Sequence, residues 1–389
     1  MCVKPAGRGF SPLDEALALI PGRLSPALAG NVAHLGVAMP FAQACGVLAR
    51  LSGVHLSQAS LRRTTLALGQ ATDAVEAGAV AVLEEGQSAA LAGPRRQQVS
   101  VDGAMLPLVG GTWGEVRTVT VATLVPAAKR GEADRANALS YFSRLTDAAN
   151  FTRLATLETH RRGTSLAGEV AAVNDGAEWI QEFVDTHCPN AVRILDWSHA
   201  AAYVHAVGHA LDDSACGAWC QSHLSELREG EPANVLVHLR ALLEELPLSH
   251  PARAQAVQSI GYLSKRLPQL QYRAFIAASL PIGSGIAESA NKLVPQARCK
   301  GAGMHWLAAN INSILALRCA LLSGRWDATL AFAIAQLRLE ACNTRQLRHI
   351  RRRPRRPRPI RPPRIQNGRP TPHHPWKRFP AVSTKHAKL

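Results

Sequence analysis

A chain of 389 residues with 47% hydrophobic residues is long enough to bury a sizeable core. No apolar run reaches the roughly 18 residues of a membrane-spanning helix, and no secretory signal pattern opens the chain, so we expect a soluble, cytoplasmic protein without a membrane partner. The eight Cys are scattered, which argues against a disulfide framework and against a zinc knuckle.

The net charge of +16 is concentrated at one end of the chain. From Thr344 to Leu389 there are 15 Lys and Arg and no Asp or Glu, which leaves 29 basic and 28 acidic groups elsewhere. Because this segment is rich in Arg and Pro and poor in apolar residues, we expect residues 346–389 to form a disordered tail. Its charge predicts a polyanionic partner, with Arg352 and Arg353 among the phosphate contacts.

The first 93 residues are expected to form a helical domain. Apolar residues recur at helical spacing from position 41, the pattern stops at Gly53, and a second helix begins after Ser57, a suitable N-cap. This predicts a helix-turn-helix at about 40–68, whose second helix would expose Arg62 and Arg63 to DNA. An ordinary pair of packed helices is the alternative.

From Arg96 the hydrophobic period changes from helical to alternating. Three strands are predicted in QQVSVDGAMLPLV, EVRTVTVATLVP and NALSYFSRL, followed by a helix, the strand GEVAAVND, a helix, the strand NAVRILD and a helix. This order predicts an α/β protein with a ribonuclease-H-like mixed sheet, built from residues 94–211 and 281–345. Residues 212–280 show no strand signal and are expected to be a helical insertion in that core.

Three carboxylates occupy prominent places in this arrangement. Asp102 follows an apolar run on the first strand, Asp175 ends the fourth, and Glu288 follows a Gly-Ser-Gly entry to a late helix. Since the first and fourth strands pair in this fold, we expect Asp102 and Asp175 to be adjacent. Such carboxylates can hold two Mg²⁺ ions, or Mn²⁺ in their place, for in-line displacement at phosphate. For each Asp-Gly taken alone, an ordinary turn is the alternative.

A second motif, ILDWSHAAAY, places Asp196 and His199 three residues apart at the start of a helix. We expect them to be accessory residues beside the carboxylates. A helix N-cap is the simpler role for Asp196, and a looser interpretation would make it the second metal ligand in place of Asp175. After Glu288, a basic stretch supplies candidate phosphate contacts at Lys292, Arg298 and Lys300, for which a solvated helix end is the alternative.

The blocks VSVDGA, NDGAEWI, ILDWSHAAAY, PIGSGIAESANKLV, ARCKGAGMHW and HPWKR together resemble the ISKra-type insertion-sequence DDE transposases, which are related to Mutator-like transposases. The resemblance covers about Gly7 to Arg378. It implies a ribonuclease-H-like core that cuts and joins double-stranded DNA at the element's terminal inverted repeats and at a target. It also implies a metal-binding triad of Asp102, Asp175 and Glu288, and a D-x-x-H signature formed by Asp196 and His199.

Three further expectations follow from this resemblance. We expect a homo-oligomer on DNA, associated with the nucleoid. Similar proteins often carry a Cys-x-x-Cys zinc ribbon before the GRGF stretch, whereas here only Cys2 precedes it; an N-terminally truncated chain and a misplaced start codon are the two interpretations. The alternative functions are a non-catalytic DNA-binding remnant of a transposase and a ribonuclease-H-like nuclease.

Overall fold

The computed structural model describes residues 24–351, except 128, 130–131, 210–212, 246, 248–249 and 251, together with residue 373. The chain divides into two compact units, Met1–Ala341 and Cys342–Leu389. Arg352 and Arg353 lie outside the described residues. All the other candidate site residues belong to the first unit.

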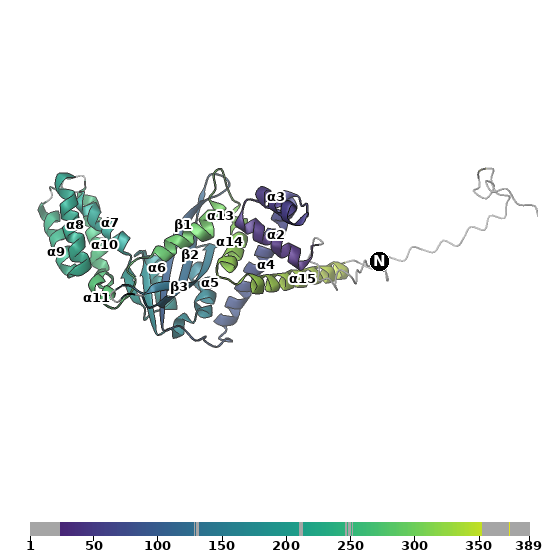
Figure 1. Ribbon diagram of the computed structural model, residues 1–389, viewed down its shortest axis with the longest axis horizontal. Coiled ribbons are helices and arrows are strands. Elements are labelled where there is room, and N and C mark those ends of the chain that lie inside the picture. Colours follow the sequence, from purple (N-terminus) through teal and green to yellow (C-terminus); the bar gives the residue numbers. More distant parts are fainter. Residues whose placement is uncertain are drawn as a thin grey trace, which may run out of the picture. The chain divides into compact units, whose positions relative to one another are not determined.

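A five-stranded mixed sheet lies at the centre of the first unit (Figure 1). Its order is β3-β2-β1-β4-β5, with antiparallel pairing among the first three strands of the chain and parallel pairing of β1 with β4 and of β4 with β5. The strand predictions are therefore confirmed. The strands are β1 (Arg96–Pro107), β2 (Trp113–Val125), β3 (Arg135–Leu145), β4 (Glu169–Asn174) and β5 (Val192–Leu195).

Helices cover both faces of this sheet. The connections α5 (Ala148–Arg161) and α6 (Glu178–His187) pack on one face, against Val99 and Val101 of β1. Leu106 of β1 belongs to the opposite core, with α14 (Ala308–Leu322). Because side chains alternate along a strand and the β1–β2 register runs without a shift, Asp102 lies on the α14 side of the sheet. This is also the side where α12 (Gly285–Asn291) contacts β1 and β2.

The N-terminal helices are α2 (Pro26–Ala38), α3 (Phe41–Ser52) and α4 (Gln58–Glu84). Gly53 ends α3 with a φ of 68°, a left-handed conformation that glycine adopts without strain. Ser57 caps α4, its Oγ accepting from the Ser60 N–H at 3.2 Å, as predicted. Among the described helices, α4 alone has the length and composition to cross a membrane, but a third of its most apolar window is buried within the protein, against α2 and α14 among others.

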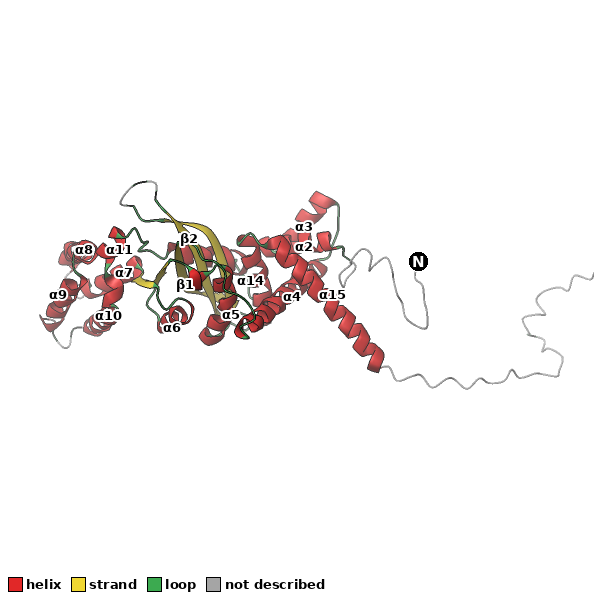
Figure 2. Ribbon diagram, turned by 90° about the horizontal axis from the view of Figure 1, so that it is seen from below, coloured by secondary structure: helices red, strands yellow, loops and turns green. Residues whose placement is uncertain are grey.

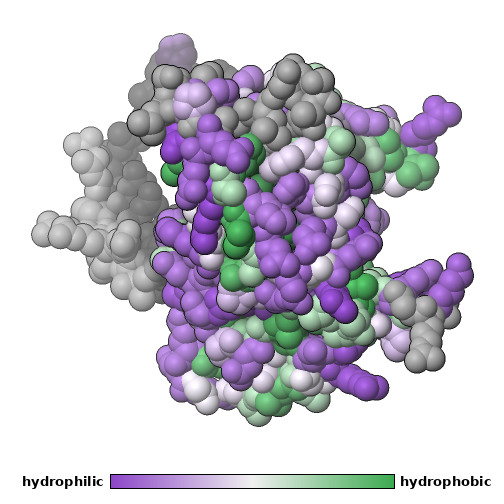
Figure 3. All heavy atoms as spheres, turned by 90° about the vertical axis from the view of Figure 1, so that its left-hand side faces the viewer, coloured by the Kyte–Doolittle hydropathy of each residue, from purple (hydrophilic) through white to green (hydrophobic). Residues whose placement is uncertain are grey.

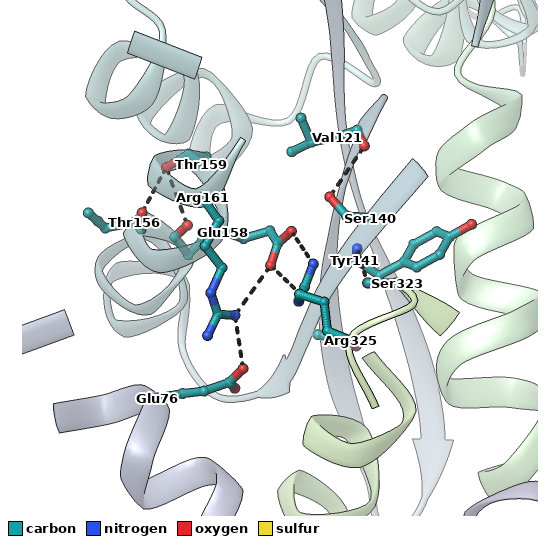
Figure 4. A network of polar contacts seen from close by, with 12 residues as sticks. Glu76, Val121, Ser140, Tyr141, Thr156, Glu158, Thr159, Arg161, Ser323 and Arg325 are labelled. Carbon is teal, nitrogen blue, oxygen red and sulfur yellow. Dashed lines mark hydrogen bonds and ion pairs between the residues drawn. The ribbon is translucent and has the colours of Figure 1, made fainter. Parts of the chain in front are cut away.

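Ion pairs fix α4 to α5 (Figure 4) and also to the sheet. Glu158 of α5 is fully buried and accepts from both terminal nitrogens of Arg325, at 3.1 and 2.7 Å. Arg161 connects Glu158, at 3.7 Å, to Glu76 of α4, at 3.2 Å. Arg144 of β3, also buried, forms a further ion pair with Glu76. These contacts join α4 to β3 and α5, and α5 to Arg325 in the loop between α14 and α15.

The described residues between 213 and 277 are mostly helical and contain no strand, as the sequence predicts. With α7 (Trp197–Gly208), which follows β5, they form a cluster that lies at the opposite end of the sheet from α2 and α3 (Figures 1 and 2). The face seen from this end is mainly hydrophilic, with separate hydrophobic patches (Figure 3). The cluster's further helices are α8 (Asp213–Glu229), α9 (Pro232–Glu245), α10 (Arg253–Lys265) and α11 (Tyr272–Ala277).

The last helices return to the sheet and lead toward the C-terminus. After α12 come a π-helical turn (Lys292–Gln296), α13 (Ala297–Cys299), α14 and α15 (Trp326–Arg351). Residues 346–351, expected to belong to a disordered tail, are thus helical. These six residues contain no proline, since the first proline of this segment is Pro354.

Candidate active site

The register between β1 and β4 brings two carboxylates together. The parallel ladder pairs Val99 with Ala172, an offset of 73 residues. Side chains continue the same offset beyond the ladder: the Ser100 hydroxyl donates to the Val173 carbonyl at 2.7 Å, and the Val101 N–H donates to Asn174 Oδ1 at 2.6 Å.

One residue further along the same offset, Asp102 comes opposite Asp175. The two are close enough for the charge of Asp175 to raise the pKa of Asp102. The structure therefore places these two predicted residues together at the carboxyl end of β4, where parallel strands often carry their sites.

Asp102 is half-buried and held at both oxygens. Its Oδ1 accepts from the Gly103 N–H at 2.7 Å, and its Oδ2 accepts from Asn291 Nδ2 at 2.8 Å. Burial raises the pKa of Asp102, the Gly103 N–H lowers it, Asp175 raises it, and Asn291 and a charged His199 lower it; the net shift is upward. Because β1 continues to Pro107, the alternative in which Asp102 is simply a turn residue is wrong.

Asp175 begins the loop that joins β4 to α6. Its Oδ1 accepts from the Ala177 N–H at 3.0 Å, so this aspartate does form the local turn that Asp-Gly predicts. The next residue, Gly176, is held from α10: its N–H donates to Tyr262 Oη at 2.7 Å, and its carbonyl accepts from Arg266 Nη2. Two side chains of the helical cluster thus fix the backbone beside Asp175.

The contact between this loop and α10 borders a cavity of about 380 Å³. The Arg266 guanidinium lies 3.9 Å from the centre of the Tyr262 ring, which itself stacks on Tyr203. No sequence pattern marked Tyr262 or Arg266, because they lie in a segment whose helical spacing predicts only packing. The available sequence signal was Gly176 itself, since a glycine near a strand can mark a place where another part of the protein approaches the backbone closely.

Asp196 has a structural role in the described contacts. It is 3% exposed and caps α7, its Oδ1 accepting from the His199 N–H at 3.1 Å, while its Oδ2 accepts from the Ser284 N–H. Burial raises its pKa, but hydrogen bonds from Ser198, Ser284 and His199 outweigh burial and lower it overall. The N-cap prediction is confirmed, and the carboxylate whose charge raises the pKa of Asp102 is Asp175. His199 is exposed on the first turn of α7.

Glu288 is on the helix that contacts Asp102 but does not itself complete a cluster. Its side chain is 61% exposed and forms an ion pair with Lys292 at 3.6 Å. Within the described part of the chain, no three His, Cys, Asp or Glu side chains gather into a group that could hold a metal ion. The residue of α12 that reaches Asp102 is Asn291, which is 4% exposed. The role of Glu288 as third ligand therefore stays a prediction.

Asn291 was not predicted from the sequence, because the predicted metal ligands were carboxylates and Asn291 carries an amide. Its spacing was the available signal, since a residue three positions after Glu288 lies on a neighbouring part of the same helix surface. Its Oδ1 is buried and has no hydrogen-bond partner.

The predicted basic contacts divide into exposed and buried residues. Arg62 and Arg63 are exposed on the first turns of α4, and Lys292 and Lys300 are exposed after Glu288. These four side chains remain available to phosphate.

Arg298 differs from those four and requires a correction. It is 2% exposed, its Nε donates to the Gly36 carbonyl at 2.8 Å, and its guanidinium lies 4.6 Å from the Phe41 ring and 5.0 Å from the Trp306 ring. These contacts commit Arg298 to joining α13 to the N-terminal helices, so the expectation of a phosphate contact was wrong. Trp306 is also buried.

The oxygen atoms around Asp102 suit a hard divalent cation. Two carboxylates repel each other in a half-buried place, and a buried amide oxygen beside them has no partner. A cation such as Mg²⁺ or Mn²⁺, which prefers oxygen ligands, would relieve both. No model of a known protein family matches the sequence, and no curated protein matches it.

Proposed function

We propose that this protein is an insertion-sequence DNA transposase that cleaves and joins DNA strands by metal-dependent phosphoryl transfer. The observation that carries the proposal is the pairing of Asp102 with Asp175 across the parallel strands β1 and β4. The strand order β3-β2-β1-β4-β5, with helices on both faces of the sheet, supports a ribonuclease-H-like fold for this core.

In this proposal Asp102 and Asp175 hold the divalent cations. Two such ions, when bound, activate the attacking oxygen and stabilise the leaving oxygen of an in-line displacement. The chain's own residues orient the carboxylates: Gly103 and Asn291 hold Asp102, and α10 holds the backbone after Asp175. Glu288 is the proposed third carboxylate, because its exposed ion pair with Lys292 costs little to break.

DNA is the proposed polyanionic partner, in double-stranded form at the element's terminal inverted repeats and at the target. The exposed pair Arg62 and Arg63 opens the second helix of the predicted helix-turn-helix, where a major-groove reader carries its contacts. Lys292 and Lys300 flank α13 on the chain segment that follows Glu288. Synapsis of two ends would require a homo-oligomer on DNA, which fits association with the nucleoid.

The test is cleavage by purified full-length protein of DNA that carries the flanking sequences of its gene, with Mg²⁺ or Mn²⁺. We expect strand nicking and joining, and we expect both Asp102→Asn and Asp175→Asn to abolish them. Asp185→Asn is the matched control, because that carboxylate is 64% exposed and pairs only with Arg193 among the described contacts.

Three outcomes would contradict the proposal. Strand transfer that survives Asp102→Asn would refute the two-carboxylate mechanism. Specific DNA binding without cleavage would indicate a non-catalytic remnant, and degradation of RNA–DNA hybrids but not of element DNA would indicate a nuclease.

A further inference from the structure

Asn291 is the residue of α12 whose side chain contacts Asp102. Its side chain is 4% exposed, and its Nδ2 donates to Asp102 Oδ2 at 2.8 Å, so one half of the amide is already engaged. The other half, Oδ1, is buried and accepts no hydrogen bond. Buried polar atoms nearly always have partners, and an unpartnered oxygen beside a candidate metal site is available to a bound ion or water.

The backbone around Asn291 is also unusual. α12 ends at Asn291, and the next residues, Lys292–Gln296, form a π-helical turn in which the Ala297 N–H bonds to the Lys292 carbonyl. The cause is Pro295, which has no N–H to give to the Asn291 carbonyl four residues earlier. Such π-turns occur frequently at functional sites. The wider turn starts immediately after Asn291.

We propose that Asn291 is a protein ligand of the divalent cation as well as the positioning residue for Asp102. Its Nδ2 orients the Asp102 carboxylate, and its Oδ1 accepts the cation or one of the cation's bound waters. An amide oxygen is a hard, neutral donor of the kind that Mg²⁺ and Mn²⁺ take. It would add an oxygen ligand to the cation site without adding a negative charge beside Asp102 and Asp175. This inference rests on the proposed function, because it assumes the cation site at Asp102.

The test measures Mn²⁺ affinity by calorimetry and by electron paramagnetic resonance of free Mn²⁺, on full-length protein without DNA. We expect Asn291→Leu, which has a similar size but no polar atoms, to weaken Mn²⁺ binding by about 10- to 100-fold, the range seen when partners of metal ligands are removed. Asn291→Asp keeps an oxygen toward the cation and should bind Mn²⁺ at least as tightly as the wild type. Ser289→Ala, at an exposed position of the same helix, should leave the affinity unchanged.

Asp102→Asn separates the failure of this inference from the failure of the proposed function. If Asp102→Asn weakens Mn²⁺ binding but Asn291→Leu does not, Asn291 has no role toward the cation and the inference is overturned, while the site at Asp102 stands. If Asp102→Asn has no effect, both fail. Should Asn291→Leu not fold, Asn291→Ala takes its place, and an unchanged Mn²⁺ affinity in a folded Asn291→Ala would overturn the inference.

Discussion

The contact between Gly176 and α10 permits a sharp test of how the Asp175 loop is held. A Cβ added at Gly176 would lie 2.0 Å from Arg266 Nε and 2.3 Å from Tyr262 Oη. Neither neighbour can move away freely, because the same two side chains bond the Gly176 carbonyl and N–H. The substitution Gly176→Ala must therefore displace the loop or separate it from α10.

The expected cost follows from these contacts. Overpacking of a filled site costs about 1–3 kcal/mol. Loss of the neutral hydrogen bond to Tyr262 adds about 1 kcal/mol, and loss of the charged bond from Arg266 adds about 1.5–3 kcal/mol. Because a shifted loop relieves the overpacking by giving up part of the bonding, the terms do not all add. We expect the free energy of unfolding to fall by about 2–4 kcal/mol.

Gly261→Ala is the matched control. Gly261 lies within α10, borders the same cavity, and has nothing within 4 Å of its added Cβ. Alanine in a helix interior is more favourable than glycine by about 0.5–1 kcal/mol, so this variant should gain stability. The two substitutions are chemically identical and lie on opposite sides of one contact, yet they should change stability in opposite directions.

Urea denaturation followed by circular dichroism measures both variants, with the midpoints compared at a common slope. Mn²⁺ affinity provides a second measurement, because Gly176 is next to Asp175: it should fall in Gly176→Ala and stay unchanged in Gly261→Ala. A Gly176→Ala protein with the midpoint and Mn²⁺ affinity of the wild type would show that α10 does not hold this loop.

Three further predictions concern a cap, an ion pair and the tail. Asp196→Ala should lower the free energy of unfolding at pH 7 by about 1–3 kcal/mol, through loss of the helix cap and of the partner of a buried N–H. Since the folded pKa of Asp196 is lowered, its contribution to stability is present above the unfolded pKa of about 3.9 and is lost as the pH falls through the folded pKa. The urea midpoints of the variant and the wild type should therefore converge in acid. Arg325→Ala leaves the fully buried Glu158 with a more distant partner and should lower the free energy of unfolding by about 3 kcal/mol. Arg153→Ala, in an exposed ion pair, should change it by less than about 1 kcal/mol. Equal urea midpoints for the two variants would contradict a stabilising role of the Arg325–Glu158 pair. Deletion of residues 352–389 removes 12 of the 44 Lys and Arg and should weaken DNA binding at every sequence. It should also reduce the slope of log K against log salt, by about 0.9 for each phosphate that these residues neutralise. An unchanged slope would exclude the tail as a main phosphate contact.

Local patterns in the chain predicted the strands and the Ser57 cap, through a period of two residues for strands and a hydroxyl before a helix. The meeting of Asp102 with Asp175 was predicted from the strand order of the expected fold, because parallel pairing of the first and fourth strands brings their ends to one edge of the sheet. The same reasoning placed Asp196 at a helix start, although only the structure showed that its carboxylate is engaged by both α7 and Ser284.

Which side chains of the late helices turn toward the site depends instead on how the elements pack. A helical insertion separates α12 from β5, so no local period relates Asn291 or Glu288 to Asp102; the rotation of α12 on the sheet brings Asn291 to Asp102 and leaves Glu288 exposed. In the same way, the sequence around Arg298 predicts a surface cation, and only the packing of α13 against Gly36 and Phe41 buries this side chain. Tyr262 and Arg266 reach Gly176 from 86 and 90 residues away. Packing between elements distant in sequence decides these contacts, and hydrophobic periodicity along the chain does not predict them.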